Sequence, residues 1–147
     1  MININHPVRT IMTENPITIM ENTTMDKVAM VFEKVQIHHI PVLNDEGTIT
    51  GIISTNDFLQ VQDKFSRFNL ESSDKVNNDF LPSLLASDVM SKNPQCIDAG
   101  SSISEAIDIF LVNVFRAILV TIDDQLVGIV TPYDVLREVS GHKRELV

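Results

Sequence analysis

The sequence predicts a mixed α/β fold built from two copies of one small unit. Two stretches of the 147 residues occur twice and in the same order. The stretch Met12-Thr-Glu-Asn-Pro16 returns as Met90-Ser-Lys-Asn-Pro94, and Gly51-Ile-Ile-Ser54-Thr-Asn-Asp57 returns as Gly128-Ile-Val-Thr131-Pro-Tyr-Asp134. A repeat of this length indicates two supersecondary units that pack together because neither buries a core alone. Any site made by one copy is therefore expected in two versions.

Each copy reads as a short strand, a helix, a strand, a hairpin, a strand and a second helix. Apolar residues at i, i+3, i+4 and i+7 predict the first helix from Met25 to Phe32, and the same spacing recurs from Ile103 to Phe110. Runs rich in branched residues predict the paired strands, at 40–43 with 49–53 and at 118–122 with 126–130.

Turn and cap residues mark where these elements begin and end. The two hairpin turns, residues 44–47 and 123–124, consist of Asn, Asp, Glu and Gly, and the second copy is one residue shorter at this point. Ser102 with Glu105 forms a capping-box pattern, and Thr24 offers an N-cap. The closing helices begin after Ser54 and Thr131, the latter followed by a proline suited to a first helical turn.

The repeat divides the chain into a first copy at 7–60, a linker at 61–85, a second copy at 86–138 and a polar tail at 139–147. The linker has no counterpart in either unit. We expect it to continue the preceding helix, form a polar loop near residues 71–79 and re-enter the second copy through a short helix. Its exposed apolar residues are candidates for contact with a second subunit.

Composition excludes several classes of protein. A formal charge of −9 argues against nucleic acid as a partner, because phosphate backbones are held by clusters of Lys and Arg. No apolar run approaches the roughly 20 residues that span a bilayer, so we expect a cytoplasmic protein with no membrane partner. The single cysteine, Cys96, cannot form an internal disulfide and is expected to be a small buried hydrophobe.

These motifs resemble a tandem pair of cystathionine-β-synthase-type (CBS) domains, the Bateman module. The resemblance depends on five features that occur in order, twice: Met-[Thr/Ser]-x-Asn-Pro, a helix, Ile-Pro-Val or Ile-Leu-Val, the glycine, and a Ser or Thr three residues before an Asp. It implies two βαββα repeats packed with pseudo-twofold symmetry, and clefts between them that bind AMP, ADP, ATP or S-adenosylmethionine. It also implies a homodimer.

Ser54 with Asp57, and Thr131 with Asp134, have two interpretations. A hydroxyl followed three residues later by a carboxylate is a common helix cap. A carboxylate at the start of a helix can also accept hydrogen bonds from the two hydroxyls of a ribose, with the helix N-terminus favouring its negative charge. The two roles need not exclude each other, because the hydroxyl can cap while the carboxylate reaches the sugar.

The resemblance supplies the remaining candidate residues. It implies that the segments at 17–19 and 95–97 run beside the base and that the strands at 40–41 and 118 form an apolar wall. The residues concerned are Ile17, Thr18, Cys96, Ile40, Pro41 and Ile118. For the phosphates it implies a polar or basic residue, so His38, His39 and Arg116 are candidates, with surface placement as the alternative for the histidines. Because adjacent strand residues point to opposite faces, we expect no metal site at the two histidines.

The sequence predicts a stand-alone regulatory module without catalysis of its own, requiring no cofactor and acting on an unknown protein. There is no Walker-type phosphate loop and no metal-ligand spacing. Because the chain is acidic, AMP, ADP or S-adenosylmethionine rank at least equal to ATP as ligands. Since Pro41 aligns with Leu119 and Thr18 with Cys96, the two clefts need not share a ligand. The alternative is a structural dimerisation module that binds no ligand.

Overall fold

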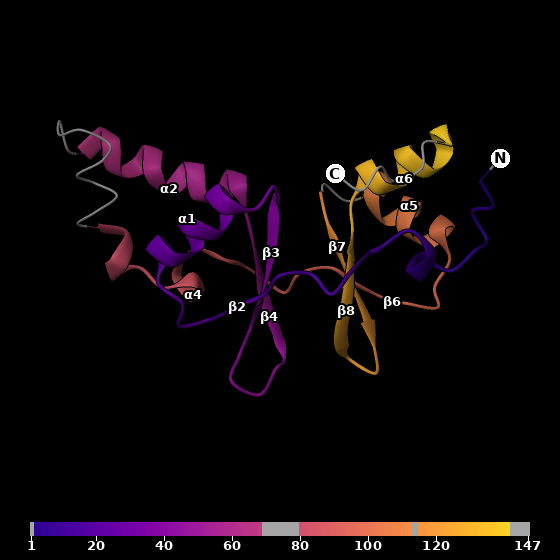
Figure 1. The fold of residues 1–147 in the computed structure, drawn as a ribbon, viewed down its shortest axis with the longest axis horizontal. Coiled ribbons are helices and arrows are strands. Elements are labelled where there is room, and N and C mark those ends of the chain that lie inside the picture. Colours follow the sequence, from indigo (N-terminus) through magenta and orange to yellow (C-terminus); the bar gives the residue numbers. More distant parts are fainter. Residues whose placement is uncertain (1, 69–79, 113–114, 142–147) are drawn as a thin grey trace. The chain divides into compact units, whose positions relative to one another are not determined.

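The computed structural model describes residues 2–68, 80–112 and 115–141, which form two compact units (Figure 1). The first-copy unit comprises Ile17–Pro94, and the second-copy unit comprises Met1–Pro16 together with Gln95–Val147. The predicted mixed α/β class is confirmed, because each unit contains one four-stranded sheet with helices. None of the described helices has the length and apolar character needed to cross a membrane.

The first-copy unit contains the predicted order of strand, helix, strand, strand and helix. Its elements are β2 (Ile19–Met20), α1 (Met25–Lys34), β3 (His39–Leu43), β4 (Ile49–Ser54) and α2 (Thr55–Phe68). Strand β2 lies parallel to β3, and β3 is antiparallel to β4. The helical stripe packs as predicted, because Met25 and Val28 are fully buried against the core side chains of β3 and β4.

The second-copy unit repeats this order. Its elements are β6 (Cys96–Asp98), α5 (Ile103–Val112), β7 (Ile118–Ile122), β8 (Gln125–Val130) and α6 (Pro132–Ser140), preceded along the chain by the short helix η1 (Val8–Thr10). Strand β6 lies parallel to β7, and β7 is antiparallel to β8. The turn between β7 and β8 holds Asp123 and Asp124 at positive φ (49° and 63°), as a tight two-residue hairpin requires.

Each sheet gains its fourth strand from the motif that precedes the other copy. Strand β1 (Thr13–Glu14) pairs with β8 of the second-copy unit, and β5 (Ser91–Lys92) pairs with β4 of the first-copy unit. The sheet orders are therefore β1-β8-β7-β6 and β2-β3-β4-β5. The boundaries drawn along the repeat do not anticipate this exchange, because each motif lies beside its own copy in sequence but pairs with the other.

The exchange explains the two repeated glycines. A Cβ on Gly51 would lie 2.8 Å from Met90 Cγ and 2.9 Å from the Ser91 carbonyl oxygen, and closer still to Met90 Sδ. A Cβ on Gly128 would meet Met12 Cγ at 2.8 Å and the Thr13 carbonyl oxygen at 3.1 Å. Each glycine therefore leaves room for the methionine and backbone of the exchanged motif.

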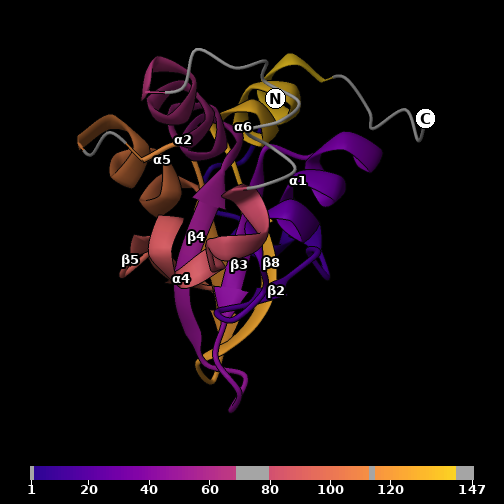
Figure 2. The ribbon, with the colours of Figure 1, turned by 90° about the vertical axis from the view of Figure 1, so that its left-hand side faces the viewer.

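The linker differs in part from its prediction. Helix α2 continues to Phe68, as expected, and residues 69–79, where we predicted the polar loop, lie outside the described residues. The short helices η2 (Leu81–Ser83) and α4 (Ala86–Val89) pack in the first-copy unit, with η2 against α1 and α4 against β4 and α2 (Figure 2). Leu81 is 4% exposed within that core, so it is not among the exposed apolar residues expected to meet a second subunit, and that contact stays a prediction.

The helix caps are confirmed in one case and wrong in the other. The Glu105 amide donates to Ser102 Oγ at 3.1 Å, which is the predicted cap of α5. The Thr24 side chain makes no such bond to the first turn of α1. Hydrogen bonding by the neighbouring Thr24 side chain lowers the pKa of the Asp26 carboxyl. Of the predicted polar tail, residues 142–147 lie outside the described residues.

Candidate functional site

The first candidate site lies where β4 ends and α2 begins. Asp57 Oδ2 accepts a hydrogen bond from the Ser54 amide at 2.9 Å, and the Asp57 amide donates to Ser54 Oγ at 3.1 Å. This reciprocal pair is a capping box, because it satisfies two amides that the helix leaves unpaired. Among the described residues, no donor reaches Asp57 Oδ1, and the side chain is half-buried rather than enclosed. The carboxylate therefore caps the helix and keeps one oxygen available.

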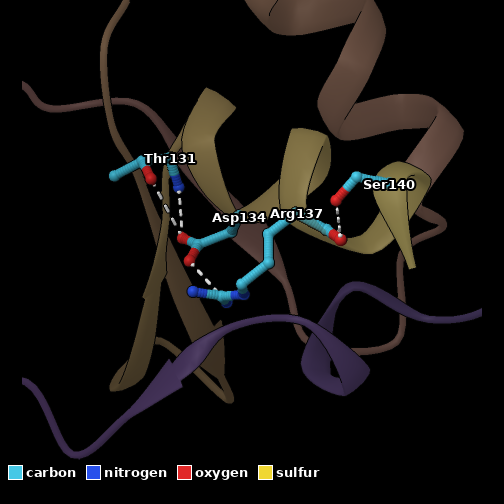
Figure 3. A network of polar contacts seen from close by, with 4 residues as sticks. All are labelled: Thr131, Asp134, Arg137 and Ser140. Atoms are coloured by element: carbon cyan, nitrogen blue, oxygen red, sulfur yellow. Dashed lines mark hydrogen bonds and ion pairs between the residues drawn. The ribbon is translucent and has the colours of Figure 1, made fainter. Parts of the chain in front are cut away.

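The second candidate site lies at the start of α6, and its carboxylate is more fully engaged (Figure 3). Asp134 Oδ2 accepts from the Thr131 amide at 2.8 Å and from Thr131 Oγ1 at 3.1 Å. Asp134 Oδ1 accepts from Arg137 Nη2 at 3.0 Å, which also makes an ion pair. Asp134 is 6% exposed, so both of its oxygens are used within a buried network.

Both candidate histidines lie beside the first of these turns. The His38 carbonyl accepts hydrogen bonds from the Thr55 amide at 2.9 Å and from Thr55 Oγ1 at 3.2 Å. The same hydroxyl lies 3.4 Å from His38 Nδ1. His39 pairs with Ser54 across β3 and β4. The sheet register therefore places both histidines next to the first turn of α2, where backbone amides favour an anion.

The second copy changes this arrangement at two points. Arg116 takes the place of His38 and is exposed. Pro132 takes the place of Thr55. Because proline has no amide hydrogen, the second copy lacks a counterpart of the hydrogen bond from the Thr55 amide to the His38 carbonyl.

The segments expected beside the base lie at the edge of each sheet. Ile17 and Thr18 are exposed and directly precede β2, which pairs in parallel with β3 through Ile19 and Val42. In the second copy, Cys96 is the first residue of β6 and pairs with Leu119. Each segment therefore lies next to the strand that carries the proposed apolar wall.

The residues expected to form that wall are buried. Ile40 and Ile118 have no exposed surface and belong to the cores of their units. Pro41 and Leu119 are the next residues along the same strands, so their side chains point to the opposite face of the sheet. They belong to neither core cluster, and they are fully buried as well. Contact of any of these four residues with a ligand stays a prediction.

Cys96 shows no sign of an activated thiol. Cys96 is exposed, so the prediction that it is a buried hydrophobe is wrong. Partial burial of the sulfur, followed by the negative charge of Asp124, raises the pKa of the thiol. Because the thiolate is the reactive form, these surroundings disfavour nucleophilic chemistry. No group of three or more His, Cys, Asp or Glu able to hold a metal ion is found in the described ranges.

Arg137 is not among the residues predicted from the sequence, although it is the cation that binds Asp134. The available signal was its position three residues after Asp134, on the same face of a helix, where the first copy has Gln60. An Arg and an Asp at this spacing are common on helix surfaces. The pairing became informative only with the burial of the carboxylate.

Comparison with known proteins agrees with the repeat. The family model for the CBS domain matches residues 8–64 and 86–141. A CBS domain-containing protein of Dictyostelium discoideum is 31% identical over 133 residues, covering 88% of this chain and 88% of that protein. Two proteins of Methanocaldococcus jannaschii are also similar: an uncharacterized protein (29% identical) and inosine-5'-monophosphate dehydrogenase (26% identical). They match 91% and 82% of this chain, which spans 43% and 21% of their respective lengths.

Solved structures share the fold. The CBS domain of a CBS domain-containing membrane protein from Sphaerobacter thermophilus has a TM-score of 0.75 and 29% identity, over 91% of this chain and 88% of that one. CBSX2, whose structure is a complex with AMP, has a TM-score of 0.72 and 22% identity, over 95% and 99% of the two chains. With both repeats matched by one family model and the same order of elements in each unit, this chain belongs to the CBS domain family and carries two copies of the domain.

Proposed function

We propose that this chain is a regulatory module, without catalysis of its own, that binds an adenosine-containing ligand and signals by conformational change. The ligand is AMP, ADP, ATP or S-adenosylmethionine, and the module requires no cofactor. The observation that carries the proposal is the carboxylate of Asp57, fixed at the start of α2 with one oxygen free of described donors. The AMP complex of the related structure CBSX2 supports the choice of ligand class.

The ribose is the group that this carboxylate suits. Two vicinal hydroxyls are donors, and an ionised carboxylate is an acceptor only. The Ser54 amide holds Asp57 in place through Oδ2, so little side-chain entropy is lost when Oδ1 accepts a sugar hydroxyl. Ser54 is therefore a positioning residue in this proposal, and Thr131 with Asp134 is the related pair of the second copy.

The neighbouring residues suit the remaining parts of a nucleotide. Ile17 and Thr18 are exposed at the sheet edge where the base would lie, next to the strand that carries the buried apolar residues Ile40 and Pro41. His38 and His39 lie next to the N-terminus of α2, where a phosphate would meet backbone amides and the imidazole of one of the two histidines. In the second copy the corresponding groups are Leu119 and Cys96 for the base and Arg116 for the phosphate.

The signal would arise through linkage. A ligand changes a conformational equilibrium only by binding one state more tightly than the other. At a free concentration of 100 times its dissociation constant, a nucleotide adds about 2.7 kcal/mol to the stability of the state that binds it. The regulated protein would be a partner of unknown identity.

Isothermal titration calorimetry on protein purified free of ligand tests the proposal. AMP, ADP, ATP and S-adenosylmethionine are each titrated at matched ionic strength, with guanosine monophosphate as the control for the base. We expect saturable heat from at least one adenosine compound and less from the guanosine control. If none of the four adenosine compounds gives a saturable heat of binding, the proposal is wrong. If the protein converts a bound nucleotide to product, the non-catalytic part of the proposal is wrong.

A structural dimerisation module that binds no ligand is the second candidate. It is favoured by apolar side chains left exposed on α5 and α6, which pack against each other. Leu111 and Val112 are 80% and 81% exposed, and Leu136 is 66% exposed. Exposed apolar groups of this kind commonly mark a protein interface. Sedimentation of the wild type and of Leu136→Glu tests whether α6 joins two copies into a homodimer, which the regulatory proposal also expects.

A further inference from the structure

The two copies differ at the residues that surround their repeated carboxylates. Aligned at an offset of 77, Asn56 and Gln60 of the first copy correspond to Tyr133 and Arg137 of the second. Arg137 donates to Asp134 Oδ1 at 3.0 Å, and its guanidinium lies 5.5 Å from the centre of the Tyr133 ring. Arg137 is therefore held by Asp134 and by the Tyr133 ring, whereas the first copy has neither an arginine nor an aromatic ring at these positions.

The hydrogen-bonding capacity of Asp134 is nearly filled from within the chain. A carboxylate offers about four lone-pair sites, and the Thr131 amide, the Thr131 hydroxyl and Arg137 occupy three of them. The side chains of Arg137 and Asp134 are 19% and 8% exposed. A ribose that displaced Arg137 would leave a partly buried guanidinium without its counter-charge, and that cost opposes binding.

The side chain of Asp57 accepts fewer hydrogen bonds from the described residues. The Ser54 amide is the one described donor that reaches its side chain, and it uses Oδ2 alone. Gln60, in the position of Arg137, is exposed and carries no charge. A sugar hydroxyl can therefore bond to Asp57 Oδ1 without breaking an existing ion pair.

From this contrast we infer that the chain binds one adenosine-containing ligand, at the first-copy carboxylate, and that Arg137 closes the second-copy carboxylate. This inference rests on the proposed function. Arg137 is thus a specificity-determining residue that sets how many adenosine sites the module has. Tyr133 supports it by holding the guanidinium through a cation–π contact.

Reciprocal substitutions test the inference, because each copy supplies the residue that the other lacks. Arg137→Gln gives the second copy the residue of the first, and Gln60→Arg does the reverse. Arg137→Lys is the matched control, since it keeps a cation beside Asp134. Adenosine and AMP are titrated by calorimetry into each full-length variant. Adenosine has no phosphate, so the loss of a positive charge cannot weaken its binding through a phosphate contact. Thermal melts check that each variant is folded.

We expect one site per chain in the wild type and in Arg137→Lys, and two in Arg137→Gln. Gln60→Arg should weaken binding by about tenfold or more, the effect of one charged hydrogen bond. Two equal sites in the wild type, or one site in folded Arg137→Gln, would overturn the inference and leave the proposed function standing. Absence of binding to every variant would defeat both. If Arg137→Gln fails to fold, the Gln60→Arg titration decides, because unchanged affinity there contradicts the role given to the arginine.

Discussion

Replacing Gly51 with alanine tests whether the motif that follows the linker belongs to the first-copy sheet. The new Cβ would lie 2.8 Å from Met90 Cγ and 2.9 Å from the Ser91 carbonyl oxygen. The methionine can move aside, but the carbonyl belongs to β5 and moves only with the strand. We therefore expect overpacking that lowers the free energy of unfolding by about 1–3 kcal/mol. Each kcal/mol corresponds to a fall of about 2–4 °C in Tm for a chain of this size.

Urea unfolding followed by circular dichroism measures the loss. Gly100→Ala is the control, because its nearest neighbour is the tip of the flexible Asp98 side chain at 3.1 Å. Adding Met90→Ala to Gly51→Ala should recover only part of the lost stability, since the Ser91 carbonyl remains in the way. A Gly51→Ala protein as stable as the control would refute the close approach of β5, and full recovery in the double variant would refute the role of the backbone.

The remaining predictions concern the caps, the hairpin and the cysteine. Asp134→Ala should cost more stability than Asp57→Ala, by about 1–2 kcal/mol in urea unfolding, because it also leaves Arg137 without its partner; equal losses would argue against the buried ion pair. Asp124→Gly should raise Tm slightly, by the equivalent of about 0.5–1 kcal/mol, because glycine adopts the observed positive φ without strain; a fall in Tm would contradict this conformation. Cys96 should react with iodoacetamide at pH 7.5 more slowly than free cysteine, because the raised pKa of its thiol reduces the thiolate; a faster rate would be inconsistent with that environment.

Local pattern was sufficient to predict the elements. The apolar spacing from Met25 and from Ile103 marks two helices that the structure contains at those residues. The branched run at Ile118–Ile122 is a strand with the predicted bounds. These predictions succeed because each element buries one face, and burial leaves a period in the sequence.

The exchange of the leading motifs could not be predicted in this way. Pairing of Thr13–Glu14 with β8 joins residues more than a hundred positions apart, and two-residue strands carry no periodic signal. The repeated glycines were visible, but their role depends on Met12 and Met90 approaching from the other motif. A tertiary contact of this kind produces no recognisable pattern in the local sequence.

The candidate site likewise has features that local sequence predicts and features that it does not. The capping role of Ser54 and Asp57 follows from their spacing and is found in the structure. The wall residues came from the resemblance alone, and the complete burial of Ile40 and Pro41 could not be inferred from it. The difference between the two carboxylates depends on whether Arg137 or Gln60 stands one turn later.

The most direct test of the account compares AMP with 2′-deoxy-AMP in the wild type and in Asp57→Asn. Asparagine keeps an oxygen that can accept from the Ser54 amide, so the cap is retained while the charge is lost. We expect the wild type to bind AMP about 10- to 150-fold more tightly than the deoxy analogue, because a hydrogen bond to a charged acceptor contributes about 1.5–3 kcal/mol. We also expect folded Asp57→Asn to lose most of this discrimination. Equal affinities for the two nucleotides in the wild type would contradict the account.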